Sequence, residues 1–202
     1  MHPTVDVRVG PGGANAHLAA RSAPLGIDVN LLQADDVEEG AVVIGDVTVR
    51  ADDPTWALEA ALLRAMAPKH VLFLCVANSA RSQIGEGLGR ALAPGDMMIS
   101  SAGSEPSFVR PQAIQVLAEV GIDATTHTSN GVDDVPRPVD AVITLCAEEV
   151  CPVWLEDAHR LHWGLPDPAG ASADPEEELN AFRAVRDELE RRLRVLFQGR
   201  PV

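Results

Sequence analysis

The sequence contains no tyrosine, and aromatic residues make up only 3% of its 202 residues. Basic residues are also scarce: 16 Lys and Arg stand against 30 Asp and Glu, which gives a net charge of −14. Nucleic-acid-binding proteins normally carry a basic patch. The one basic cluster is Arg191, Arg192 and Arg194, which we interpret as a solvent-exposed helix face. We therefore expect no nucleic-acid partner.

Long apolar runs and abundant cysteines are missing as well. No run of 18 apolar residues occurs, so we expect no membrane span. Residues 1–10 lack the charged and apolar regions of a signal peptide. The chain has three cysteines, an odd number. This suits a reducing compartment, where thiols carry out chemistry rather than form structural disulfides. These absences predict a cytoplasmic protein.

The sequence pattern changes near residue 67. Residues 1–67 form an extension with two clear signals, a hairpin around Gly45-Asp46 and a helix from Pro54 to about Met66. The Gly-rich segment 10–16 lacks both a preceding long strand and the following Lys-Ser/Thr of a phosphate loop, so we assign it no chemistry. We predict that residues 68–202 form a separate domain.

Strand and helix patterns alternate from Lys69 onward. The predicted strands cover residues 71–74, 97–101, 139–145 and 160–163, and the predicted helices cover 82–93, 111–120 and 176–197. This order predicts an α/β fold, a four-stranded parallel sheet with helices on both faces. Ligands of such sheets bind beyond the carboxyl ends of the strands. Cys75 and Cys146 both lie at such ends.

The segment CVANSARS, residues 75–82, joins the first predicted strand to the first helix. Its backbone N–H groups and the helix N-terminus can line a bowl for a tetrahedral oxyanion. Arg81 can hold two oxygens of that anion at once, and the positive surroundings favour the thiolate of Cys75 as a nucleophile. Ser82 can donate a hydrogen bond to that thiolate. The predicted oxyanion-binding residues are Val76, Ala77, Asn78, Ser79, Ala80, Arg81 and Ser82.

The segment CVANSARSQIGEG resembles the phosphate-loop signature of the low-molecular-weight protein tyrosine phosphatases and of the arsenate reductases built on the same fold. The stretches SAGSEP, HTS and FRAVRDELERRL are similar to the reductases, as is HWGLPDPAG at residues 162–170. The resemblance covers about residues 69–196. It implies that Cys75 and Arg81 are catalytic and that Asp167 is the acid, which can protonate a leaving oxygen.

Two features favour the reductases over the phosphatases. The phosphatases usually carry tyrosines after the Asp-Pro pair, whereas Ala169 follows it here and the chain has no tyrosine. The chain also has three thiols. If arsenate is esterified on Cys75, then Cys146 can attack the Cys75 sulfur and expel arsenite. Cys151 can next attack Cys146 and present a Cys146–Cys151 disulfide to an external reductant.

Several alternatives stay open at this stage. Only four residues separate Cys146 from Cys151, so thioredoxin, glutaredoxin and a low-molecular-weight thiol are all candidate reductants. The alternative function is a phosphatase that hydrolyses phosphate monoesters through a Cys75 phosphocysteine. A third hypothesis is an oxyanion-binding regulatory module whose function lies in residues 1–67.

The same residues raise two metal-site hypotheses. A zinc site at Cys146 and Cys151 with two nearby histidines is disfavoured by its loose ligand spacing. The resemblance also implies a structural potassium ion near the anion loop. Its ligands would be Asn78, Glu86 and Ser101, and Asn130 stands where an acid is expected.

Overall fold

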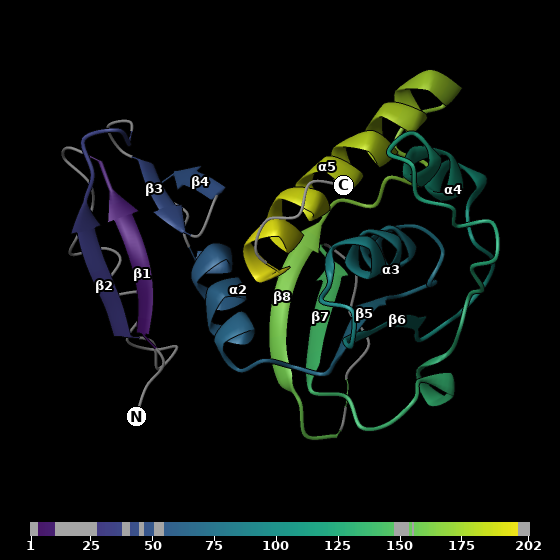
Figure 1. Cartoon of the computed structure of the whole chain (residues 1–202). Helices are drawn as coiled ribbons and strands as arrows, with labels where there is room; N and C mark the ends of the chain where they lie inside the picture. The colour runs from purple at the N-terminus through teal and green to yellow at the C-terminus, as the bar shows by residue number, and fades with distance from the viewer. Residues whose placement is uncertain are drawn as a thin grey trace. The chain divides into compact units, whose positions relative to one another are not determined.

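The computed structural model describes residues 4–10, 28–37, 41–44, 47–50, 55–147, 154 and 156–197. These residues fold as two compact units. One unit contains the described residues up to Ala67 together with residues 191–197, and the other contains the described part of residues 68–190. Figure 1 labels the helices and strands of each unit.

The larger unit is built on an all-parallel sheet with the strand order β6-β5-β7-β8. The strands are β5 (His70–Cys75), β6 (Met98–Gly103), β7 (Ala141–Cys146) and β8 (His159–Leu165). Every residue of β5 is buried, as expected for a central strand covered on both faces. The predicted four-stranded parallel sheet is confirmed, and the carboxyl ends of β5 and β7 carry Cys75 and Cys146.

Different segments cover the two faces of this sheet. On one face, α3 (Arg81–Leu92) lies against β5 and β6. On the other face, Leu72 and Leu74 of β5 belong to a buried cluster with Val135 and Trp154. Apolar side chains from β5 and from two later segments of the chain are thus buried together, which holds these segments against the sheet.

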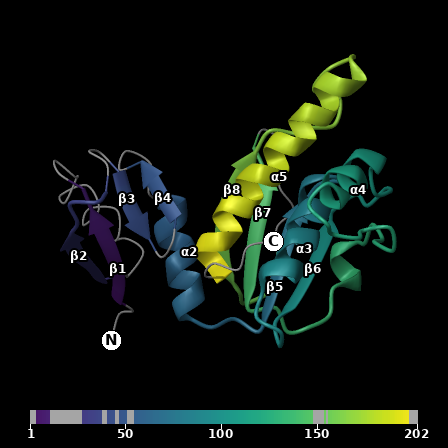
Figure 2. The ribbon, with the colours of Figure 1, turned by 45° about the horizontal axis from the view of Figure 1, so that its top comes forward.

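Two further helices complete the larger unit. α4 (Pro111–Ala118) packs on α3, and a Cβ atom at Gly87 of α3 would lie only 2.7 Å from Leu117 Cδ1. The missing side chain at Gly87 therefore lets the two helices approach closely. α5 (Pro175–Phe197) begins in this unit, and Figure 2 shows its ribbon in front of β7 and β8. Its predicted inward residues Leu179, Phe182, Val185, Leu189 and Leu193 are all buried.

The smaller unit contains a second sheet, with the strand order β2-β1-β3-β4. β1 (Thr4–Val9) pairs in parallel with β2 (Asp28–Gln33), and β3 (Ala41–Ile44) is antiparallel to both β1 and β4 (Val47–Arg50). The β3–β4 pair confirms the predicted hairpin, although its Gly45-Asp46 turn lies outside the described residues. The Gly-rich segment 11–16 lies outside them too. α2 (Thr55–Ala65) confirms the predicted helix.

Two strands of the smaller unit were not predicted, and one expectation was wrong. The sequence analysis missed β1 and β2, although the alternating valines of TVDVRV are a period-two strand signal. Arg191 and Arg192 are half-buried rather than solvent-exposed, with their guanidinium carbons 4.5 and 5.4 Å from the centroid of the Trp56 ring. Stacking on an aromatic face explains their burial.

None of the helices in the described ranges is long and apolar enough to cross a membrane.

Candidate oxyanion site

The predicted anion loop, residues 76–80, leaves the sheet at Cys75 and ends at Arg81, the first residue of α3. It surrounds a cavity of about 150 Å³. Drug-sized ligand sites measure roughly 300–1,000 Å³, so this cavity suits a small ion. The cavity is lined by Cys75, Val76, Ala77, Ser79, Ala80, Arg81 and Asp167.

The loop is held from outside by the segment that follows β6. Backbone N–H groups of residues 105, 107 and 110 donate to the carbonyl oxygens of Val76, Ala77 and Ser79, at 2.9, 3.1 and 2.9 Å. A Cβ atom at Gly103 would lie 2.3 Å from the Val76 carbonyl oxygen, so only glycine permits this close approach. Because these carbonyl oxygens point outward, the peptide N–H groups of the loop are left for the cavity side, where an anion needs them.

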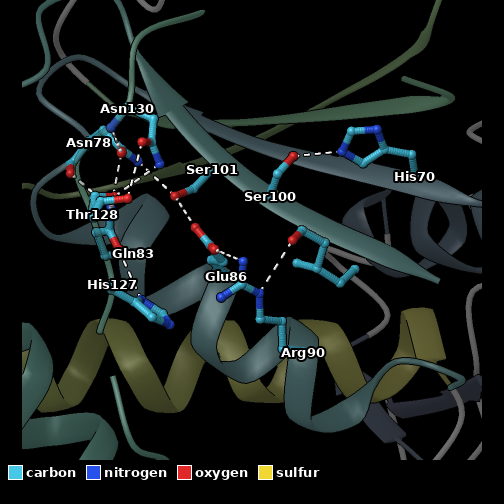
Figure 3. A network of polar contacts seen from close by, with 11 residues as sticks. His70, Asn78, Gln83, Glu86, Arg90, Ser100, Ser101, His127, Thr128 and Asn130 are labelled. Atoms are coloured by element: carbon cyan, nitrogen blue, oxygen red, sulfur yellow. Dashed lines mark hydrogen bonds and ion pairs between the residues drawn. The ribbon is translucent and has the colours of Figure 1, made fainter. Parts of the chain in front are cut away.

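Asn78 holds the loop from inside. It is fully buried and has a φ of 44°, a left-handed conformation that asparagine tolerates better than most residues. Its Oδ1 accepts hydrogen bonds from the Asn130 backbone N–H at 2.7 Å and from Gln83 Nε2 at 3.0 Å. The backbone donor fixes which side-chain atom is the oxygen, so Nδ2 must point the other way. Figure 3 shows these contacts around Asn78.

Ser82 links this arrangement to the thiol of Cys75. Asn78 Nδ2 donates to Ser82 Oγ at 2.9 Å, and Ser82 Oγ lies 2.9 Å from Cys75 Sγ. Because Ser82 Oγ accepts from Asn78, its own hydrogen is available to the sulfur. A hydroxyl donor stabilises a thiolate relative to a thiol. The arrangement can therefore present Cys75 as a nucleophile at the base of the cavity.

Arg81 and Asp167 meet at the cavity wall. The Arg81 side chain is 4% exposed; its Nη1 donates to the Leu165 carbonyl at 3.0 Å and its Nη2 lies 3.2 Å from Asp167 Oδ2. Asp167 is 44% exposed and also accepts from the Ala169 backbone N–H at 3.1 Å. A carboxyl group held beside an anion cavity and open to water can exchange protons with a bound oxyanion.

Cys146 lies at the end of β7, next to the strand that ends at Cys75. Both thiols are buried, with Cys146 1% and Cys75 2% exposed. The β7–β8 pairing is irregular at this point, with Cys146 opposite Leu165, the residue whose carbonyl binds Arg81. The structure thus brings the predicted site residues Cys75, Arg81 and Asp167 together around one cavity, whereas Cys146 lies at the end of the neighbouring strand and does not line it. The third thiol, Cys151, lies outside the described residues.

Sequence reasoning missed Gln83, which connects several segments of the site. Its Nε2 donates to Asn78 O, Asn78 Oδ1 and Thr128 O at 3.1, 3.0 and 2.9 Å. Its Oε1 lies 3.0 Å from His127 Nδ1, which must be the donor. Burial lowers the pKa of His127. The available signal was a polar residue in the first turn of the helix that follows the anion loop.

The parallel sheet and the site together define a class: α/β proteins that hold a cysteine and an arginine around a small anion cavity at the end of a strand. Residues 70–199 match the model of the family described as low molecular weight phosphotyrosine protein phosphatase, and the chain belongs to this family. The resemblance recognised in the sequence is confirmed.

The similar proteins include several named arsenate reductases. One from Halalkalibacterium halodurans is 40% identical over 132 residues, which cover 64% of this chain and 95% of the relative. The solved arsenate reductase of Archaeoglobus fulgidus is 30% identical, with a TM-score of 0.52 over 61% of this chain and 98% of its own. Another solved arsenate reductase, in the phosphate binding state, is 36% identical with a TM-score of 0.53, over 64% of this chain and 96% of its own.

Proposed function

We infer that the protein is an enzyme that reduces arsenate to arsenite. The observation that carries this inference is the place of Cys146: a buried cysteine at the end of β7, the strand that pairs with the one ending in Cys75. A phosphatase needs one cysteine, whereas a reductase needs further thiols to supply electrons. Relatives named arsenate reductase, 40% identical over nearly their whole length, support the same assignment.

The first step we propose is adduct formation. Arsenate enters the cavity of about 150 Å³ and is held by loop N–H groups and by Arg81. The Cys75 thiolate, hydrogen-bonded by Ser82, attacks arsenic. Asp167 protonates the departing oxygen, which leaves as water. The product is an S–As(V) adduct on Cys75, with no change of oxidation state so far.

The second step transfers the electrons. The Cys146 thiolate attacks Cys75 Sγ and forms a Cys75–Cys146 disulfide. The S–As bond breaks and its electron pair stays on arsenic, which leaves as arsenite, As(III). The two thiols lose the two electrons that arsenic gains. The steps require no tightly bound cofactor, because the thiols supply these electrons.

The third step regenerates Cys75. Cys151 attacks Cys146, which frees Cys75 and leaves a Cys146–Cys151 disulfide for an external thiol reductant to open. We propose thioredoxin or a similar protein, glutaredoxin or a low-molecular-weight thiol for this role. Dependence on such reductants places the protein in a reducing compartment, for which we propose the cytoplasm.

We further propose that residues 68–202 form the catalytic domain and that residues 1–67 are an extension outside it. The family match, which begins at residue 70, supports this boundary. None of the proposed chemical steps uses a residue of the extension.

The test is arsenite release by the full chain with thioredoxin or glutaredoxin supplied. Cys146→Ser should form the Cys75 adduct without releasing arsenite, and Cys151→Ser should complete one turnover and stop with a Cys75–Cys146 disulfide, visible as a mass loss after arsenate treatment. Cys75→Ser is the matched control and should form no adduct. If both Cys146→Ser and Cys151→Ser turn over normally, the relay is wrong. Aryl-phosphate hydrolysis that survives both changes would instead favour the phosphatase, which the family match keeps as the second candidate.

A further inference from the structure

A polar cluster contacts the anion loop at Asn78, a loop residue that does not line the cavity of Cys75. We name it the support cluster and define it as Asn78, Glu86, Arg90 and Ser101 (Figure 3). Asn78, Glu86 and Ser101 are 0, 5 and 2% exposed, whereas Arg90 reaches toward solvent with 54% of its side chain exposed. A carboxylate as buried as that of Glu86 needs a positive partner or several hydrogen bonds.

The hydrogen bonds of the support cluster run in one direction. Asn78 Nδ2 donates to Ser101 Oγ at 2.8 Å, which leaves the Ser101 hydroxyl hydrogen for Glu86 Oε2. The other oxygen of Glu86, Oε1, forms an ion pair with Arg90 Nη2, four residues along α3. Arg90 Nε also lies 3.4 Å from the Ile99 carbonyl on β6. One row of contacts therefore connects the guanidinium of Arg90 to Asn78, and through Ser82 to the sulfur of Cys75.

A potassium ion, which the family resemblance implies at this place, does not fit these residues. Asn78 Oδ1 already accepts from the Asn130 backbone N–H and from Gln83. Ser101 Oγ accepts from Asn78, and both oxygens of Glu86 are engaged by Ser101 and Arg90. Asn130 supplies a neutral amide, and its Oδ1 accepts from Thr128 Oγ1 at 3.1 Å. Across the described ranges, moreover, no three His, Cys, Asp or Glu side chains are grouped so as to hold a metal ion.

We propose that Arg90 is a positioning residue: its guanidinium supplies from within the chain the positive charge that holds Glu86, and thereby Ser101, Asn78 and the anion loop. The thiolate of Cys75 depends on Arg90 through the Ser82 hydroxyl. The importance of Arg90 for catalysis rests on the proposed function. The arrangement of the loop and the reactivity of Cys75, however, are properties of the protein without substrate and can be measured without arsenate.

The cavity beside the support cluster leads to an expectation for a variant that lacks the Arg90 guanidinium. A cavity of about 230 Å³ adjoins the support cluster and is lined by Glu86, Arg90, Ser101 and Asn130, among other residues. Without the guanidinium, the Glu86 carboxylate would face this cavity with an unpaired oxygen. A monovalent cation from solution could then occupy the place of the guanidinium. Removal of Arg90 should therefore convert a cation-independent protein into a cation-dependent one.

The experiment measures the rate constant for alkylation of Cys75 by iodoacetamide, with Cys146 and Cys151 replaced by serine so that one thiol reacts. Phosphate affinity is measured in parallel. Potassium, sodium and choline chloride are compared at equal ionic strength. With Arg90 present, the rate should be the same in all three salts. In Arg90→Met the rate in choline should fall about two- to fivefold, the effect of losing a half-exposed ion pair, and potassium or sodium should restore part of it.

Three matched variants sharpen the result. Arg90→Lys should keep most of the rate. Adding Glu86→Gln to Arg90→Met should abolish the response to cations, because the charge that attracts them is gone. Lys69→Met removes an exposed ion pair with Asp96 elsewhere in the unit and should change nothing.

Two outcomes would overturn the inference. One is an Arg90→Met protein that stays folded by circular dichroism and keeps the parent's alkylation rate and phosphate affinity in every salt. The other is a protein with intact Arg90 whose alkylation rate depends on potassium. Failure of the proposed function looks different: the alkylation results would hold, but wild type would release no arsenite.

Discussion

The Ser82 hydroxyl lies 2.9 Å from the sulfur of Cys75, and Asn78 determines the direction of this hydrogen bond by donating to the same hydroxyl oxygen. Asn78 therefore influences the reactivity of the Cys75 sulfur through Ser82, without contacting the sulfur itself. This relationship makes the reactivity of Cys75 sensitive to residues on several segments, and four measurements follow from it and from its surroundings.

Ser82→Ala should slow the alkylation of Cys75 about ten- to a hundredfold, because a buried sulfur loses its hydroxyl donor and a hydrogen bond to a charged group is worth about 1.5–3 kcal/mol. Arsenate reduction should slow by a similar factor. Ser104→Ala is the control, since Ser104 is an exposed serine just beyond β6. Equal alkylation rates in Ser82→Ala and wild type would show that Ser82 does not act on the thiol.

Asp167→Asn should separate binding from chemistry. The amide keeps the shape of the side chain but removes a negative charge 3.2 Å from Arg81, so phosphate affinity should stay the same or rise. Loss of the proton donor should slow formation of the Cys75 adduct by about 10²-fold or more. Calorimetry with phosphate and rapid-quench mass analysis with arsenate measure the two effects. Adduct formation at the wild-type rate would remove Asp167 from the mechanism.

Gly103→Ala should disturb the anion loop. The added Cβ would lie 2.3 Å from the Val76 carbonyl oxygen and 2.7 Å from the Asn78 nitrogen, and backbone atoms cannot move aside cheaply. We expect a loss of about 1–3 kcal/mol in the free energy of unfolding, together with weaker phosphate binding. The matched control is Gly95→Ala, where an added Cβ meets nothing within 4 Å. Denaturant titration and phosphate calorimetry compare the two variants, and similar effects in both would refute the steric argument.

His127 should make the protein less stable in acid. Burial lowers its pKa in the folded state, so below the ordinary value of about 6.5 the unfolded chain binds more protons than the folded one. The contribution of neutral His127 to the free energy of unfolding is complete above that pH, and it is lost as the pH falls through the lowered pKa of the folded state. His127→Asn retains a donor for Gln83 but does not titrate.

Denaturant titrations between pH 5 and 7 measure this effect. The decrease in unfolding free energy should be smaller in His127→Asn, with a difference in slope of at most about 1.4 kcal/mol per pH unit. The pKa of His159 is also lowered by burial, but His159 is present in both proteins and cancels in the comparison. Parallel stability curves would contradict the assignment.

Much of the larger unit was predictable because its signals are local. A continuous apolar run predicted β5, and it is buried throughout. The predicted helix over residues 111–120 is confirmed as α4, and Gly121, three residues after the last residue of α4, has a φ of +80°. The smaller unit was harder to predict, because β1 and β2 pair across a separation of 24 residues that carries no hairpin signal.

The sequence by itself determined the chemistry that is offered: a thiol at the end of a strand, an arginine at the start of a helix and a second cysteine at the end of another strand. Each of these depends on residues that are neighbours in the chain. Only the tertiary structure decided what holds that chemistry in place. Asn130 reaches Asn78 across 52 residues, and Ser101 reaches Glu86 across 15. Such contacts depend on which strands become neighbours, which sequence periodicity does not encode.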